Sequence, residues 1–211
     1  MPEPRSAPRP AVAVFDVDGT LTSGDCVLPF LRRVAGRRLA FALLRRPLAL
    51  LAGLVRGDRD VLKALACASL AGIPATEIDS QGAEFAREVV SSQLRDDTTA
   101  RLRRHRERGH TVVLASASLD AYLEPLGGLL GADEVVCTVL ARGADGLLTG
   151  RLEGVNCRGP EKARRVRSLL EARGLGNAEL WAYGDSRDDD ALLAIADHPL
   201  RVDGVRVVPD P

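Results

Sequence analysis

The sequence has few of the residues that mark several common classes of protein. Aromatic side chains make up only 3% of its 211 residues, and 29 lysines and arginines are balanced by 29 aspartates and glutamates. So few rings for stacking and so little net charge argue against a nucleic-acid partner. The four cysteines are far apart without a Cys-x-x-Cys pair, and the three histidines are scattered. We therefore expect free thiols in a reducing compartment, and neither a zinc site nor an imidazole site.

Long hydrophobic runs are also absent. The most apolar stretch, residues 39–55, is interrupted by Arg45-Arg46-Pro47, and neither half approaches the roughly 18–20 residues that span a bilayer. Residues 1–10, MPEPRSAPRP, lack the apolar core of a signal peptide, so we expect a flexible tail. With 45% hydrophobic and 27% charged residues, the composition is ordinary for a soluble globular protein, and we expect a cytoplasmic location.

Two carboxylates follow the first apolar segment. Residues 11–15, AVAVF, predict a parallel strand buried on both faces, and Asp16 and Asp18 follow where it must end. Side chains at i and i+2 of a strand point the same way, so the two carboxylates are expected to share one small space. Ligands of parallel α/β sheets bind at this carboxyl end. Because Asp-Gly is also common turn chemistry, the pair alone leaves a plain turn open.

A long helical insert then interrupts the α/β pattern. It contains no convincing strand, and apolar periodicity predicts helices at residues 28–34, 39–55, 60–71 and 77–92. An insert of about 70 residues is too long for a simple connection, so we predict a separate helical cap. The apolar side chains of residues 39–55 would also suit a less polar substrate or a membrane surface, but packing in the cap core is the interpretation we favour.

The α/β pattern resumes at residue 97. Alternating strands and helices are predicted to the end of the chain: strands at 111–115, 134–140, 147–152, 179–183 and 205–208, and helices at 98–108, 160–173 and 189–196, with another ending near 130. We therefore divide the chain into an α/β core of residues 11–22 and 97–211 and a helical cap of residues 23–96.

Three further element ends carry polar side chains. Ser116 follows a buried apolar strand, so its hydroxyl and the amide of Ala117 would face the same sheet edge as the carboxylate pair, although a serine there also commonly caps a helix. Lys162 lies in the first turn of a helix, where the dipole disfavours a cation. A nearby phosphate would offset that cost, and a solvated surface lysine is the alternative. Asp185 ends a strand on the ligand-binding edge.

Together these groups fit phosphoryl transfer. Oxygen ligands from Asp16, Asp18 and Asp185 suit Mg²⁺, a hard ion that often binds together with substrate phosphate. Lys162 and Ser116 can hold phosphate oxygens, and positioning with charge neutralisation supplies most of the catalysis in such reactions. Asp16 can attack phosphorus to form an aspartyl-phosphate. Asp18 can protonate the leaving oxygen and then deprotonate the hydrolytic water.

The same motifs, in the same order, resemble those of the haloacid dehalogenase-like hydrolases. The resemblance spans nearly the whole chain and rests on Phe15 to Thr20, Ser116 after its strand, Lys162 at its helix start, and Gly184-Asp185-Ser186-Arg187-Asp188-Asp189. It implies an α/β fold with a three-layer, Rossmann-like core of five parallel strands, and Mg²⁺-dependent hydrolysis of a phosphomonoester. The insert after the first strand is similar to the small helical-bundle cap of the subclass that contains phosphoserine phosphatase.

The resemblance also implies roles for single residues. Asp16 is the expected nucleophile and Asp18 the expected general acid and base. The metal ligands it implies are Asp16, the Asp18 carbonyl and Asp185, with Asp189 in support. The phosphate-binding residues are Ser116, Lys162, Ala117 and Gly19.

The cap departs from the phosphoserine phosphatase pattern. Asp25 falls roughly where those enzymes place a glutamate that contacts the substrate amine, and their carboxylate-binding arginine aligns near Ala66, with Lys63 the nearest cation. We expect Asp25 and Lys63 to contribute to the choice of a small phosphorylated substrate. Phosphoserine itself and a lipid-type phosphate stay as alternatives.

Two other classes of protein are weighed against a phosphatase. A phospho-receiver domain also uses an aspartyl-phosphate, but it lacks a helical insert and carries its acidic pair apart from the phosphorylated aspartate. A non-catalytic interaction protein on the same fold is the second rival. The sequence leaves the oligomeric state open, a homodimer included.

Overall fold

The sheet is built around β1 (Ala11–Phe15), whose apolar sequence AVAVF is buried at four of its five positions. In the computed structural model, which describes residues 9–203, β1 pairs in parallel with β2 (Thr111–Leu119) and with β5 (Glu179–Gly184). A strand with a neighbour on each side and helices on both faces needs apolar residues at successive positions. This explains why the first strand is the most uniformly apolar segment of the core.

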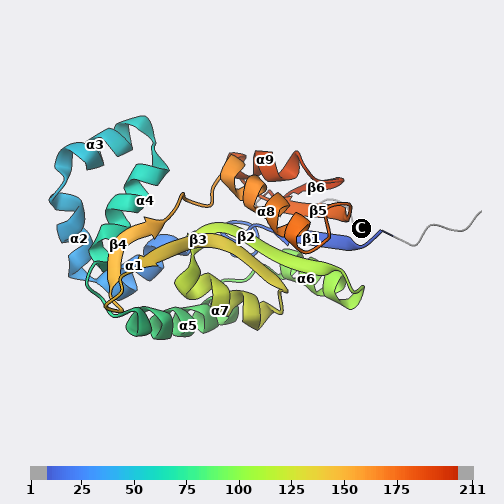
Figure 1. Cartoon of the computed structure of the whole chain (residues 1–211), viewed down its shortest axis with the longest axis horizontal. Coiled ribbons are helices and arrows are strands. Elements are labelled where there is room, and N and C mark those ends of the chain that lie inside the picture. The colour runs from blue at the N-terminus through green and yellow to red at the C-terminus, as the bar shows by residue number, and fades with distance from the viewer. Residues whose placement is uncertain (1–8, 204–211) are drawn as a thin grey trace, which may run out of the picture.

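The complete sheet has six strands in the order β4-β3-β2-β1-β5-β6 (Figure 1). Five are parallel, and β4 (Leu148–Glu153) runs antiparallel to β3 (Glu134–Arg142) at one edge. At the other edge β6 (His198–Arg201) pairs with β5. The expected α/β fold is therefore confirmed. The strand at β6 was missed by the sequence analysis, and the one predicted at 205–208 lies outside the described residues.

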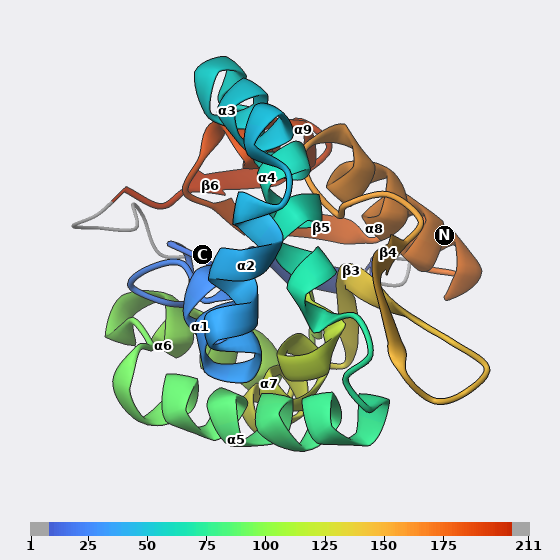
Figure 2. The ribbon, with the colours of Figure 1, turned by 90° about the vertical axis from the view of Figure 1, so that its left-hand side faces the viewer.

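Helices cover both faces of the sheet, as Figures 1 and 2 show. Alternate residues of β1 enter two separate apolar cores: Ala13 and Phe15 belong to one, and Val12 and Val14 to the other. The first core lies against α5 (Ala75–Ser92), α6 (Asp96–Glu107) and α7 (Asp120–Leu130). The second lies against α8 (Pro160–Ala172) and α9 (Asp190–Leu193), which follows the short 3₁₀ turn η2 (Arg187–Asp189). The period-two alternation of a strand produces this three-layer arrangement.

The insert after β1 forms helices, as predicted, but more of them. They are α1 (Val27–Ala35), α2 (Arg37–Leu44), α3 (Pro47–Arg56), α4 (Arg59–Cys67), the 3₁₀ turn η1 (Ala68–Leu70) and α5. The single helix predicted at residues 39–55 is wrong. Pro47 lacks an amide hydrogen and occupies the first turn of α3, so the chain turns at Arg45 and Arg46 into a new helix.

The last helix of the insert packs on the core. Gly82 of α5 lies so close to α7 that a Cβ atom there would stand 1.9 Å from the carbonyl oxygen of Ala121. Glycine is therefore required at this crossing, because any side chain would push the two helices apart. The division into a cap of residues 23–96 and a core stays a prediction.

The expectation that residues 39–55 fill the cap core is wrong for most of their large side chains. Leu39 is buried, but Leu44, Leu48 and Val55 are 72%, 82% and 78% exposed. The two short helices of this stretch, α2 and α3, each have one inward-facing stripe, and the remaining leucines face solvent. Among residues 9–203, no helix is both long enough and apolar enough to cross a bilayer.

Candidate active site

A cavity of about 620 Å³ lies between the carboxyl ends of the core strands and the helices α1 and α4. Its core wall is polar and its cap wall is largely apolar. The core wall includes Asp16, Asp18, Gly19, Ser116, Ala117, Lys162 and Asp185, and the cap wall includes Asp25, Val27, Leu28, Leu31, Leu62, Lys63 and Ala66. Every residue predicted for the site lines this cavity except Asp189, which lies buried behind it.

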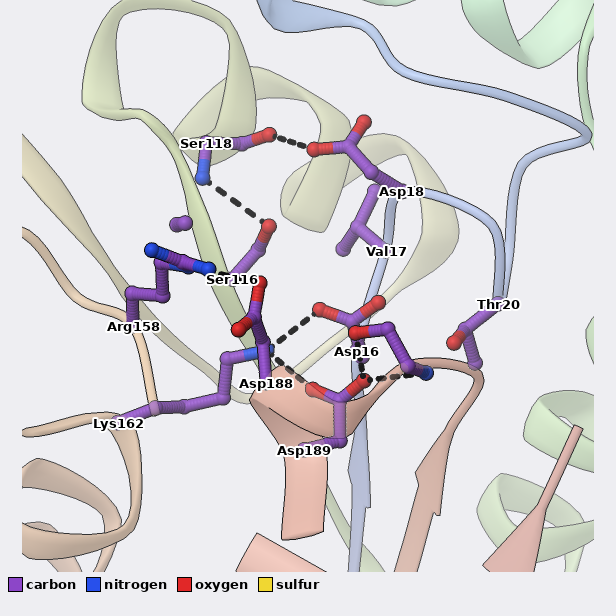
Figure 3. Close-up of polar contacts among 12 residues, drawn as sticks. Asp16, Val17, Asp18, Thr20, Ser116, Ser118, Arg158, Lys162, Asp188 and Asp189 are labelled. Carbon is purple, nitrogen blue, oxygen red and sulfur yellow. Dashed lines mark hydrogen bonds and ion pairs between the residues drawn. The ribbon is translucent and has the colours of Figure 1, made fainter. Parts of the chain in front are cut away.

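Lys162 joins the two sides of a buried acidic cluster (Figure 3). Its Nζ donates to Asp16 Oδ1 and to Asp189 Oδ1, both at 2.6 Å, and all three side chains are buried. The lysine is not a solvated surface residue, so that alternative is wrong. Two carboxylates thus share one ammonium group, and each of the three side chains has little exposure to solvent.

The cluster contains two carboxylates and one ammonium group, and their pKa values are shifted by burial and by one another's charge. Burial raises the pKa of the Asp16 carboxyl to about 7; Lys162 opposes that shift, and the charge of Asp189 adds to it. Burial lowers the pKa of Lys162, but the two carboxylates raise it by more, so its net shift is upward. The ammonium group therefore stays charged, and the site has a surplus of negative charge that a further cation would reduce.

Asp185 completes a group of three carboxylates. One oxygen from each of Asp16, Asp185 and Asp189 lies within 4.8 Å of the other two. Burial and the charge of Asp189 raise the pKa of Asp185. Hard oxygen donors that repel one another suit a divalent cation such as Mg²⁺, so these residues fit the expected ion.

Two glycines make room for the acidic group. A Cβ at Gly19, whose φ is +85°, would stand 2.4 Å from Asp185 Oδ2, and one at Gly184 would stand 2.4 Å from the Asp189 Cβ. Asp189 is also fixed by Ser186, whose amide and hydroxyl both donate to its Oδ2 at 3.1 Å. Both oxygens of Asp189 thus accept hydrogen bonds, and its supporting role toward the metal stays a prediction.

Asp18 reaches the cavity in a different way from the one predicted. The strand ends at Phe15, so the i, i+2 alternation does not extend to Asp18, which lies in the following turn. Its Oδ1 accepts from the amide of Cys26 at 2.8 Å, and its Oδ2 accepts from the hydroxyl of Ser118. Burial raises its pKa, and these two donors partly offset the rise. The carboxylate of Asp18 is therefore held apart from the cluster of Asp16, as Figure 3 shows.

Ser116 and Ala117, the predicted phosphate-binding residues of this strand, lie at the irregular end of β2. Pairing with β3 shifts register between Ala115 and Leu119, and Ser116 is buried there at the edge of the cavity. The amide of Ser118 donates to Ser116 Oγ at 3.0 Å. Ser118 was not predicted for the site, although it repeats the serine of the motif two residues later, where a strand places it on the same side.

Lys63 extends from α4 into the core wall. It donates to the carbonyl of Ala117, to Asn156 Oδ1 at 2.8 Å and to Thr138 Oγ1 at 3.2 Å. Burial lowers its pKa. Asp25, by contrast, is exposed and accepts hydrogen bonds from the amides that begin α1, Val27 at 3.1 Å and Leu28 at 3.4 Å. Both predicted cap residues line the cavity, and Lys63 also links α4 to the end of β2 through the carbonyl of Ala117.

Two arginines in the cavity wall were not predicted. Arg158 donates from Nε to Asp188 Oδ2 at 2.7 Å, and Arg59 of α4 lies 3.7 Å from the same oxygen. In a chain with so many arginines, the sequence does not separate these two from those on the surface. Lysine is the clearer indicator of the site, because the sequence contains only two lysines and both of them line this cavity.

The fold and the site define a hydrolase class. Residues 13–194 match the family model of the haloacid dehalogenase-like hydrolases. The chain belongs to this family, as its motifs indicated.

Curated relatives extend over most of the chain. Protein CicA of Caulobacter vibrioides is 39% identical over 190 residues, which cover 90% of this chain and 84% of CicA. Phosphoserine phosphatase SerB1 of Mycobacterium tuberculosis is 31% identical over 192 residues, which cover 88% of this chain and 62% of SerB1.

Solved structures share the fold. A protein of unknown function from Bordetella pertussis Tohama I has a TM-score of 0.72 at 26% identity, over 88% of this chain and 86% of that one. A phosphoserine phosphatase solved as a phospho-aspartyl intermediate analogue has a TM-score of 0.61 at 18% identity, over 89% of this chain and 84% of that one. At such low identity this second likeness shows the fold alone.

Proposed function

We propose that this chain is a Mg²⁺-dependent phosphatase that hydrolyses a small phosphomonoester through an aspartyl-phosphate on Asp16. The observation that carries the proposal is the buried contact of Asp16 with Lys162, 2.6 Å long, at the bottom of a cavity that Ser116 and Asp18 also line. A nucleophile, a phosphate-binding cation, a hydroxyl and a second acid are thus within one substrate's reach. The family membership and the relative SerB1 support the same class of reaction.

The first step forms a bond between Asp16 and phosphorus. A carboxylate oxygen of Asp16 attacks, the bond from phosphorus to the ester oxygen breaks, and Asp18 gives its proton to the leaving oxygen. Burial raises the pKa of Asp18, which increases the fraction that carries the proton needed here. Lys162 and Ser116 hold the phosphoryl oxygens while charge shifts from the nucleophile to the leaving group.

The second step returns Asp16 to its starting state. The Asp18 carboxylate accepts a proton from water, and the water oxygen attacks the phosphorus of the aspartyl-phosphate. The bond between phosphorus and Asp16 breaks, and inorganic phosphate leaves. The net reaction consumes one ester and one water and yields one alcohol and one phosphate.

The carboxylates of Asp16, Asp185 and Asp189 would hold Mg²⁺, with the carbonyl of Asp18 as a further ligand implied by the family resemblance. When bound, the ion supplies positive charge that neutralises the phosphate oxygens and the acidic cluster. The two glycines described above keep Asp185 and Asp189 close enough to share it.

The cavity favours a leaving group less polar than serine. Leu28, Leu31 and Leu62 form much of its cap wall, and Ala66 supplies no charge. The cations that line the cavity already have partners: Lys162 and the two arginines contact carboxylates, and Lys63 contacts amide and hydroxyl oxygens. A substrate carboxylate would have to displace one of them. Lys63 and Asp25 remain the side chains we propose to influence substrate choice.

Phosphate release from an aryl phosphate tests the reaction. Wild type in excess Mg²⁺ is expected to release phosphate, and Asp16→Asn to reduce the rate to background, because an amide cannot act as the nucleophile. Asp190→Asn is the matched control, since Asp190 is exposed and pairs with Arg201 on the surface. Equal rates for wild type and Asp16→Asn would exclude the proposed reaction, and faster hydrolysis of phosphoserine than of the aryl ester would exclude the proposed substrate class.

A further inference from the structure

One surface of the cap has no role in the proposed reaction. It consists of α2 and α3 with the bend between them, residues 37–56, called here the α2–α3 segment. The segment lies at the end of the molecule where the cap extends beyond the core, with α3 at the tip (Figure 1). Ten large apolar side chains are exposed within residues 9–203, and six of them belong to the α2–α3 segment: Phe41, Leu44, Leu48, Leu51, Leu54 and Val55.

The exposed apolar residues are ordered along the two helices. Phe41 and Leu44 are three residues apart on α2, and Leu48, Leu51 and Leu54 repeat the same interval on α3. Residues three or four apart lie on one face of a helix. The opposite side packs inward, where Leu39 is buried and Gly53 fits against Leu62 of α4. Each helix therefore presents an apolar stripe to solvent while a second stripe holds it to the cap.

Arginines surround these stripes. The sequence has no aspartate or glutamate between Asp25 and Asp58, and it has seven arginines there. Five of them belong to the α2–α3 segment and are exposed, namely Arg37, Arg38, Arg45, Arg46 and Arg56. Within the described residues none of these five forms an ion pair with a carboxylate, whereas Arg33 of α1 pairs with Glu84 and Glu88. The α2–α3 segment is a local excess of positive charge on a chain with no net charge.

We propose that the α2–α3 segment docks this protein on the surface of an anionic lipid bilayer. A helix with leucines on one face and flanking arginines lies in the interface, its apolar side chains among the acyl chains and its arginines at the lipid phosphates. Long arginine side chains reach the headgroups while their stems stay on the apolar surface. The helices α1 and α4, which line the cavity, adjoin α2 and α3, so docking places the cap wall of the cavity next to the helices on the bilayer.

Two other occupants fit the surface less well. A second copy of the chain, related by a two-fold axis, would bring the same arginines together with no acidic residue of the α2–α3 segment to pair with them. A nucleic acid would neutralise the arginines but leave the six apolar side chains without a partner, because its contacts are mainly with phosphates. A bilayer with anionic headgroups matches both features.

Co-sedimentation of the full chain with vesicles tests the proposal without any need for catalysis. Vesicles of phosphatidylcholine alone are compared with vesicles of phosphatidylcholine and phosphatidylglycerol at about seven to three. We expect the protein to pellet with the anionic vesicles and to be released by salt. The double variant Arg45→Glu/Arg46→Glu is expected to bind at least about thirtyfold more weakly, since each arginine near an anionic surface contributes roughly a factor of five. Leu44→Gln/Leu48→Gln is also expected to weaken binding, by removing apolar contact.

Matched variants on the core separate docking from a general effect of charge or hydrophobicity. Arg103→Glu/Arg167→Glu makes the same change in net charge on the exposed faces of α6 and α8, and Leu129→Gln/Val155→Gln removes two exposed apolar residues elsewhere. These controls are expected to bind as wild type does. Equal weakening by variants of the α2–α3 segment and by the control variants would overturn the proposal, as would equal binding to vesicles with and without anionic lipid. Sedimentation velocity that shows a dimer dissociated by Leu44→Gln/Leu48→Gln would assign the surface to a second copy instead.

Discussion

Replacing Lys162 with methionine removes the one positive charge that two buried carboxylates share. The Nζ lies 2.6 Å from Asp16 Oδ1 and 2.6 Å from Asp189 Oδ1, and the side chains of the three residues are 3%, 7% and 1% exposed. Loss of one partner from a buried ion pair costs roughly 3–5 kcal/mol, because the remaining charge stays buried without compensation. For a chain of this length, that corresponds to a fall in melting temperature of about 10 °C.

Added Mg²⁺ separates this explanation from a simple packing defect. Methionine fills nearly the same volume as the lysine stem, so the lost stability is mainly electrostatic. A divalent cation among Asp16, Asp185 and Asp189 supplies the missing charge, so Mg²⁺ is expected to raise the melting temperature of Lys162→Met by more than that of wild type. Lowering the pH is also expected to reduce the difference in melting temperature between wild type and Lys162→Met, because protonation of Asp16 removes the uncompensated charge.

Thermal unfolding followed by circular dichroism, with chelator and with excess Mg²⁺, measures both effects. Arg164→Met is the control on the same helix, because the pair of Arg164 with Glu161 is on the surface and such pairs contribute little. A Lys162→Met melting temperature no lower than that of Arg164→Met would refute the buried ion pair. A large loss that Mg²⁺ does not reduce would refute the shared carboxylate site while leaving the ion pair intact.

Three further changes test other parts of the structure. Lys63→Met is expected to lower the free energy of unfolding in urea by about 2 kcal/mol, since three buried oxygens lose a donor, whereas Asp25→Ala, at an exposed position, is expected to cost less than half of that. Burial lowers the pKa of His105 to about 4 from 6.5, so the unfolded chain binds a proton before the folded one does. Stability is expected to fall by about 2 kcal/mol from about pH 7 to about pH 5, and His105→Phe to flatten that dependence. Gly82→Ala is expected to lower the free energy of unfolding by several kcal/mol. Gly128→Ala is the control, because Gly128 is also helical but has open space around it, and it is expected to be neutral or slightly stabilising. Similar melting temperatures for the two variants would contradict the close crossing of α5 and α7.

The parts of the molecule that local sequence controls were predicted well. The run AVAVF predicts a doubly buried strand from composition alone, and Pro160 marks the beginning of α8 because its missing amide costs nothing there. Lys162 was predicted at the site because a cation in a first helical turn needs an explanation. These signals lie within a few residues of the feature they predict.

The parts that depend on distant contacts were predicted poorly. β6 contains His198 and Pro199, and its sequence lacks the pattern of a strand. It forms because Trp181 to Gly184 of β5 are at the edge of the sheet and pair with it. Ser118 and Lys63 acquire their roles from partners that lie far away in the sequence, Asp18 and Asn156. A lysine at the edge of an apolar helix face gives no indication of which distant oxygens it will contact.

The placement of the two lysines makes amine chemistry a direct probe of the cavity. Arginine supplies the remaining basic side chains, and arginine does not react with reagents that acylate amines. Such reagents therefore have only two lysine side chains to modify, Lys63 and Lys162, and both line the cavity. Because burial lowers the pKa of Lys63 while the acidic cluster raises that of Lys162, Lys63 has the larger fraction of uncharged amine, which is the form that reacts. The rate at which an acyl group is added to Lys63, located by mass spectrometry of peptides so that the terminal amino group is counted apart, thus reports whether the cavity is open or filled, with no background from lysines on the surface.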